Sequence, residues 1–190
     1  MTINSHMQMD KPYKILDLHV DSELLNFDFS SITDVHWDKN QNLKQKFPDI
    51  FADVKPFRVM YLELSKWNDP ENHDPVPEND DHPVHALLMN EIRKLEELYN
   101  AKAKIVVLDG LPPGGKINRH FDQSKIYDQC HRVHLPLVTD PAVKFFIDDV
   151  PYHFRAGEFF EFNNKMYHEV HNDSNIFRIH LVVDLLPNNG

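Results

Sequence analysis

Hydrophobic and polar residues alternate in short runs through the second half of the chain. The runs are rich in Val, Ile, Leu and Phe, and turn-forming Pro, Gly, Asn and Asp residues separate them. Short strands with turns and no helices between them are typical of an antiparallel sandwich or barrel. The pattern predicts strands over residues 105–108, 116–122, 131–138, 143–147, 152–155, 158–162, 167–170 and 177–186.

The first half of the chain has a different pattern. Residues 14–20 and 57–64 predict two further strands, and residues 37–47 predict an irregular or partly helical region. Residues 85–99 carry apolar side chains three and four positions apart, which predicts an amphipathic helix that packs on a flat surface and ends at Asn100. The apolar positions of this helix are Leu88, Met89, Ile92, Leu95 and Leu98.

These patterns predict one domain of the mainly β (α+β) class. We expect a double-stranded β-helix, the jelly-roll or cupin-like barrel, with N-terminal helices packed outside. Residues 13–103 would be supporting elements and residues 104–187 the catalytic barrel core. Residues 68–83, dense in Pro, Asp and Asn, predict a long acidic loop. Residues 1–12 are expected to be disordered or a remnant of an expression vector.

Composition and charge remove several classes of function. Thirteen histidines accompany a single cysteine, which excludes a disulfide framework and cysteine-based zinc or iron–sulfur sites. A formal net charge of −10 argues against nucleic acid or an anionic membrane as a partner. The sequence has no long apolar run and no signal-like start, so we expect a cytoplasmic protein that neither spans nor binds a membrane. The oligomeric state stays open.

Alternation places basic side chains on one face of two predicted strands. In residues 131–138 the apolar side chains share one face, and Arg132 and His134 lie on the other. Residues 177–186 repeat this arrangement, with polar positions Arg178, His180 and Asp184. These side chains either form a solvent-exposed row or line a polar barrel interior.

The tripeptide His120-Phe121-Asp122 suggests a metal site. Side chains two positions apart on a strand share a face, so His120 and Asp122 could be neighbouring ligands. A histidine from a distant strand, His168 or His171, would complete the two-histidine, one-carboxylate triad of mononuclear non-haem Fe(II) sites. The tripeptide alone is weak evidence, because it also fits an exposed strand.

The two arginines suggest a cosubstrate for such an iron. A 2-oxo acid chelates a metal through its 1-carboxylate and keto oxygen, and its far carboxylate needs a cation. The planar guanidinium of Arg132 or Arg178 suits that carboxylate. The same arginines could instead form structural ion pairs with carboxylates such as Asp184.

Several short blocks of the sequence resemble the motifs of a known protein family. They are Pro113-Gly114 followed by His120, residues 130–137, residues 156–162, Tyr167-His168-Glu169-Val170, Phe177-Arg178-Ile179 and Val183-Asp184. On these blocks residues 104–187 resemble the aspartyl/asparaginyl β-hydroxylase family of Fe(II)/2-oxoglutarate-dependent oxygenases. The run from Gly157 through His168 to Arg178 is the specific part.

The resemblance implies roles for individual residues. His120 and His168 would bind iron, and His168 is preferred to His171 because it occupies the family's His-Glu-Val position. Arg178 would bind the distal carboxylate of 2-oxoglutarate, and Arg132 with His134 would contact the carboxylate next to the metal. The implied cofactors are Fe(II), 2-oxoglutarate and O2.

The sequence also departs from the family pattern. The best-studied animal members lack the carboxylate ligand, whereas Asp122 is present here and gives a full triad with His120 and His168. Asp109 stands where those members have a hydroxyl, and an ionised Asp would repel the cosubstrate, so we assign Asp109 no binding role. Both differences weaken the inference to an Asp or Asn residue as substrate.

The leading hypothesis is a dioxygenase that hydroxylates an amino-acid side chain, an Asp/Asn-type residue in a peptide or protein, and releases succinate and CO2. One alternative is a hydroxylase of a free amino acid such as proline. An alternative of another class is a non-catalytic, cupin-like module that binds a metal or an anion. The expected partner is therefore an amino-acid or peptide substrate.

Overall fold

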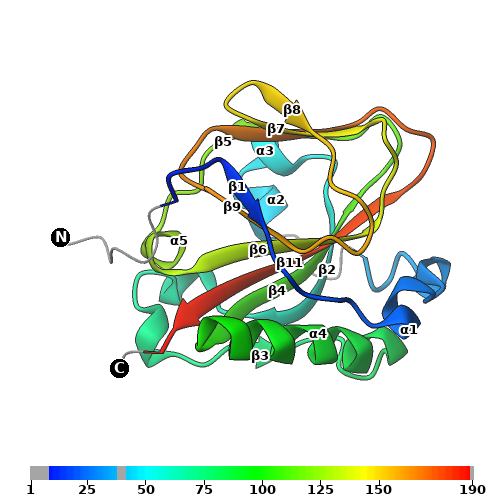
Figure 1. The fold of residues 1–190 in the computed structure, drawn as a ribbon. Coiled ribbons are helices and arrows are strands. Elements are labelled where there is room, and N and C mark those ends of the chain that lie inside the picture. Colours follow the sequence, from blue (N-terminus) through cyan, green and yellow to red (C-terminus); the bar gives the residue numbers. More distant parts are fainter. Residues whose placement is uncertain (1–8, 38–41, 189–190) are drawn as a thin grey trace.

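The computed structural model describes residues 9–37 and 42–188, which form two antiparallel β-sheets facing each other (Figure 1). The larger sheet has the strand order β1 (Tyr13–Ile15), β9 (Phe160–Phe162), β6 (His131–Val138), β11 (Arg178–Pro187), β4 (Ala101–Leu111), β2 (Lys55–Tyr61) and β3 (Val76–Pro77). The smaller sheet has the order β5 (Lys116–His120), β10 (His168–Asn172), β7 (Val143–Ile147) and β8 (Val150–Tyr152). This architecture confirms the predicted mainly β class and jelly-roll fold.

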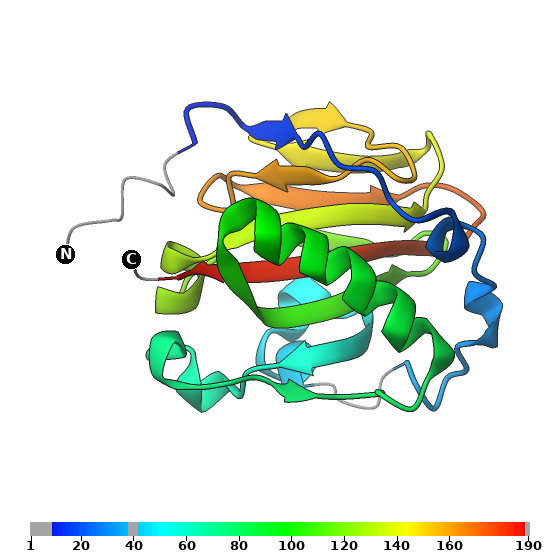
Figure 2. The same cartoon turned by 60° about the horizontal axis from the view of Figure 1, so that its bottom comes forward.

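Most of the helical segments precede the barrel strands and lie outside it, as predicted. They are α1 (Ser22–Leu25), α2 (Asn42–Lys46), α3 (Pro48–Phe51), α4 (Pro83–Tyr99) and α5 (Lys125–Gln129), with 3₁₀ turns at Phe29–Ser31, Leu64–Lys66 and Pro70–Asn72. Helix α4 runs across the outer face of the larger sheet (Figure 2). At its C-terminus Asn100 adopts a left-handed conformation, and its N–H donates to the carbonyls of Glu96 and Glu97, which ends the helix as expected.

The central strands β6 and β11 have one apolar and one polar face. Val133, Leu135 and their counterparts on β11 pack under α4 in the main hydrophobic core. The opposite, inner face carries the polar interior, which is also largely buried: Asp184 and Arg178 are fully enclosed. The polar interior comprises Arg132, His134, Arg178, His180 and Asp184. Of the two predicted alternatives, the structure shows the polar barrel interior and not the solvent-exposed row.

Some predicted boundaries are wrong. Helix α5 lies between β5 and β6, where no helix was expected, because the buried Ile126 and Tyr127 anchor a single short turn that leaves little periodicity in the sequence. The acidic loop 68–83 is partly ordered, since β3 pairs with β2 inside it. Strand β1 ends at Ile15, several residues earlier than predicted.

Other expectations concern what lies around the barrel. Most of residues 1–12 and part of residues 37–47 lie outside the described residues. The division into supporting elements and a barrel core stays a prediction. Among residues 9–37 and 42–188, no helix is both long and apolar enough to cross a membrane.

Helix α4 offers a direct test of how the larger sheet is stabilised. Leu88 is fully buried, whereas Leu98, which the sequence placed in the same apolar row, is 53% exposed. We expect Leu88→Ala to lower the free energy of unfolding by about 2–5 kcal/mol, because it removes buried methyl groups and leaves a cavity. Leu98→Ala is the matched control and should change it by less than about 0.5 kcal/mol. Denaturant unfolding measures both, and equal effects would contradict this packing.

Candidate metal centre

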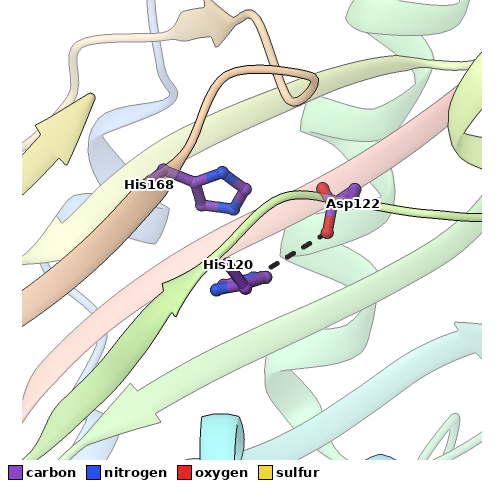
Figure 3. Close-up of side chains that lie close together, drawn as sticks. All are labelled: His120, Asp122 and His168. Atoms are coloured by element: carbon purple, nitrogen blue, oxygen red, sulfur yellow. Dashed lines mark ion pairs between the residues drawn. The ribbon is translucent and has the colours of Figure 1, made fainter. Parts of the chain in front are cut away.

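Three predicted ligands meet where β5 and β10 lie side by side. These strands pair antiparallel with His168 directly opposite His120, and Asp122 follows β5 in the next loop. One ligand atom from each residue lies within 4.8 Å of the others, and the three side chains converge in Figure 3. We call His120, Asp122 and His168 the metal cluster.

Backbone carbonyls orient both histidines of the metal cluster. Nδ1 of His120 lies 2.7 Å from the carbonyl oxygen of Asn118, and Nδ1 of His168 lies 3.0 Å from that of Met166. A carbonyl only accepts hydrogen bonds, so each Nδ1 carries the proton and each Nε2 keeps a lone pair. Nε2 of His120 lies 3.8 Å from Oδ1 of Asp122. The cluster therefore presents two imidazole nitrogens and one carboxylate oxygen.

The charge states suit a divalent cation. Burial lowers the pKa of His168 from 6.5 to about 4 and also lowers the pKa of His120. Both rings are therefore neutral near pH 7, as metal binding requires. Two neutral imidazoles and one carboxylate fit the facial set of non-haem Fe(II) centres. His171 lies apart from the cluster, with its Nε2 3.5 Å from Glu169.

Arg132 lies beside the metal cluster and pairs with two carboxylates. Nε and NH2 donate to the two oxygens of Asp184 at 2.7 and 2.8 Å, and NH1 donates to Oδ2 of Asp122 at 2.8 Å. This is the ion pairing that the sequence offered as the alternative for Arg132. The expected contact between Arg132 and the cosubstrate stays a prediction.

Arg178 presents the opposite situation. It is fully buried, and its NH1 donates to Oδ2 of Asp109 at 3.0 Å. Its Nε and NH2 have no hydrogen-bond partner among the described residues, and neither ring nitrogen of the nearby His134 and His180 has one there. Buried polar groups are rarely left unpaired, so this part of the polar interior fits an anionic molecule that brings its own acceptors.

Sequence reasoning missed the pairing of Asp109 with Arg178. Asp109 is directly opposite His180 in the β4–β11 ladder, so it shares a face with the polar interior. The alternation of residues 105–111 could have indicated the face, but not which cation Asp109 meets.

Known proteins resemble this chain in sequence family and in fold. The family model described as aspartyl/asparaginyl beta-hydroxylase matches residues 29–187. No curated protein matches the chain as a relative.

Solved structures share the fold at low sequence identity. A 2OG-Fe(II) oxygenase family oxidoreductase from Burkholderia pseudomallei is 13% identical, with a TM-score of 0.57 over 94% of this chain and 86% of that one. A prolyl hydroxylase from Trichoplax adhaerens, in complex with a hypoxia-inducible-factor peptide fragment, is 12% identical, with a TM-score of 0.56 over 93% and 84% of the two chains. A viral collagen prolyl hydroxylase from Paramecium Bursaria Chlorella virus-1 is 8% identical, with a TM-score of 0.54 over 95% and 98%.

The buried histidines make stability depend on pH. Burial lowers the pKa values of His134 and His180 well below 6.5. The unfolded chain therefore takes up protons below pH ~6.5 that the folded chain does not, so the free energy of unfolding decreases as the pH falls. Each such histidine contributes a slope of up to about 1.4 kcal/mol per pH unit.

We expect His180→Gln to reduce this slope by one histidine's contribution. Denaturant unfolding of the metal-free protein between about pH 8 and about pH 5 measures it. His19→Gln removes an exposed histidine and is the matched control. An unchanged slope in His180→Gln would show that this side chain is not held neutral by burial.

Proposed function

Because the chain belongs to the aspartyl/asparaginyl beta-hydroxylase family of 2-oxoglutarate- and Fe(II)-dependent oxygenases, we propose that it hydroxylates an amino-acid side chain with release of succinate and CO2. One observation carries the proposal. The metal cluster and the unpartnered N–H groups of Arg178 lie in the same barrel, so a metal and a bound dicarboxylate can be held there together.

The metal cluster would hold Fe(II), with His120 and His168 ligating through Nε2 and Asp122 through a carboxylate oxygen. When bound, iron and 2-oxoglutarate would supply the oxidation by O2. The protein's residues would bind the metal and the cosubstrate, orient the substrate and exclude water. Residues 104–187 would form the catalytic core, with residues 13–103 supporting it.

Arg178 would bind the distal carboxylate of 2-oxoglutarate. Its NH2 and Nε form one edge of the guanidinium, which pairs with a carboxylate through two parallel hydrogen bonds. His134 would donate to the carboxylate next to the metal, because both its ring nitrogens are buried without a described partner. Phenylalanines surround this histidine and limit the entry of water; they are Phe145, Phe160 and Phe162.

The proposed substrate is an Asp/Asn-type residue within a peptide or protein. A free amino acid such as proline is the second candidate. The prolyl hydroxylase from Trichoplax adhaerens was solved in complex with a peptide fragment, which supports a peptide substrate, although it is only 12% identical to this chain.

The first test replaces a ligand of the metal cluster. His120→Ala should abolish both the Fe(II)-dependent conversion of 2-oxoglutarate to succinate and the formation of a product heavier by one oxygen atom. Mass spectrometry across a panel of amino acids and Asp- or Asn-containing peptides measures product and succinate. His171→Ala, on β10 with His168 but outside the cluster, is the matched control and should retain activity. Full succinate production by His120→Ala would exclude the proposed metal centre.

The second test concerns the Arg178–Asp109 pair. Arg178→Lys keeps the charge but loses the planar fork, so we expect the dissociation constant of 2-oxoglutarate to rise at least about tenfold. Asp109→Asn keeps the shape but removes a negative charge beside the distal carboxylate, so that constant should fall about three- to tenfold. Calorimetry with Mn(II)-loaded protein measures both. Equal affinities in both variants and the unmodified protein would place the cosubstrate elsewhere.

A further inference from the structure

Arg132 connects the metal cluster to a carboxylate behind it. Asp184 takes the Nε–NH2 edge of the guanidinium through both of its oxygens, and Asp122 takes NH1 through Oδ2 alone. The guanidinium therefore bridges two carboxylates, one of which belongs to the metal cluster.

The guanidinium is held in place from several sides. Arg132 on β6 and Asp184 on β11 are directly opposite in the strand ladder, so sheet pairing itself brings them together. Asp184 is fully buried, and the ring of Tyr127 covers the guanidinium with its centroid 4.3 Å from Cζ. Although burial opposes the charged form, the two carboxylates raise the pKa of Arg132 well above its ordinary value. Arg132 is thus a fixed cation.

This fixed cation determines how the Asp122 carboxylate faces the histidines. Oδ2 is occupied by Arg132, and Oδ1 lies 3.8 Å from Nε2 of His120. The backbone of Asp122 is fixed as well: its N–H donates to the carbonyl of Asn164 at 3.0 Å, and its carbonyl accepts from Nζ of Lys165 at 3.1 Å. A carboxylate held in this way offers one oxygen to a metal without further ordering.

We propose that Arg132 is a positioning residue for the metal ligand Asp122, and that Asp184 holds Arg132 in that role. The inference rests on the proposed function, because it assigns Asp122 to the metal. It differs from the expected role of Arg132 as a contact of 2-oxoglutarate.

Asp184 has a second effect on the metal. By taking two N–H groups it shares the positive charge of Arg132, so Asp122 receives one hydrogen bond and remains a good ligand. Without the negative charge of Asp184, Arg132 would have Asp122 as its only carboxylate partner among the described residues and would compete with the metal for it. The pair also offsets the repulsion between a guanidinium and a nearby divalent cation.

The experiment measures Co(II) binding to the full chain in the absence of 2-oxoglutarate, by titration of the visible ligand-field spectrum. We expect Asp184→Asn to weaken Co(II) binding about 10- to 100-fold, the usual effect of removing a group that orients a ligand. Asp109→Asn is the matched control, because it also removes a carboxylate that pairs with an arginine of the polar interior. Its Co(II) affinity should fall much less than that of Asp184→Asn, because the Asp109 carboxylate hydrogen-bonds Arg178 and acts on the ligand His120 only through space.

A second pair of variants tests whether the planar shape of Arg132, and not only its charge, affects Co(II) affinity. Arg132→Lys keeps the charge but cannot bridge two carboxylates in a fixed plane, so Co(II) affinity should fall about tenfold. Arg178→Lys is its control and should leave Co(II) affinity unchanged. Asp184→Asn, which keeps the shape of the side chain, decides the question if Arg132→Lys does not fold.

The outcomes distinguish the two proposals. If Asp184→Asn and Arg132→Lys bind Co(II) as the unmodified protein does, and only their affinity for 2-oxoglutarate falls, Arg132 is a cosubstrate contact and the inference is wrong. If the unmodified protein binds no Co(II), the proposed metal centre itself fails. If it binds Co(II) and both variants weaken that binding, the inference holds even where no 2-oxoglutarate is converted.

Discussion

The ion pair between Arg132 and the fully buried Asp184 is the interaction on which the polar half of this barrel depends. Neither charge is tolerable alone in a dry interior, where an unpaired ion costs several kcal/mol. Because the two residues lie opposite each other on β6 and β11, the pair can form only when the central strands are in register. That register also aligns the apolar faces of both strands under α4. One cross-strand pair thereby links the hydrophobic core to the metal cluster.

The two arginines of the polar interior differ in how completely their nitrogens are paired, and this difference explains how the interior is organised. Arg132 uses three N–H groups on carboxylates of the protein and behaves as part of the framework. Arg178 uses NH1 on Asp109, whereas its other nitrogens have no partner among the described residues. A guanidinium with all three nitrogens bonded to the protein fixes geometry, whereas one with two unbonded nitrogens retains capacity for a ligand. Because both side chains are arginines, their different roles follow from the carboxylates that surround each of them.

Local patterns in the sequence predicted more of the fold than of the ion pairs and hydrogen bonds in the site. Strands β6 and β7 have the predicted bounds, and alternation correctly put Arg132 and His134 on one face. Alternation shows which side chains share a face of a strand, but not which strand lies next to it. The pairing of Arg132 with Asp184 could therefore not be predicted, because it depends on the β6–β11 register. Short elements such as α5 are set by tertiary contacts with Ile126 and Tyr127, which no local periodicity reveals.

The pairing of His120 with His168 has a topological consequence. These side chains come from adjacent antiparallel strands of the smaller sheet, and the chain between them builds β6, β7, β8 and β9. A single ion bound to both would close that long segment into a loop, in the manner of a reversible cross-link. A slip of β10 by one residue would turn His168 to the opposite face of the sheet and open the loop. The bound ion would therefore stabilise the native alignment of β5 and β10 relative to alignments shifted by one residue.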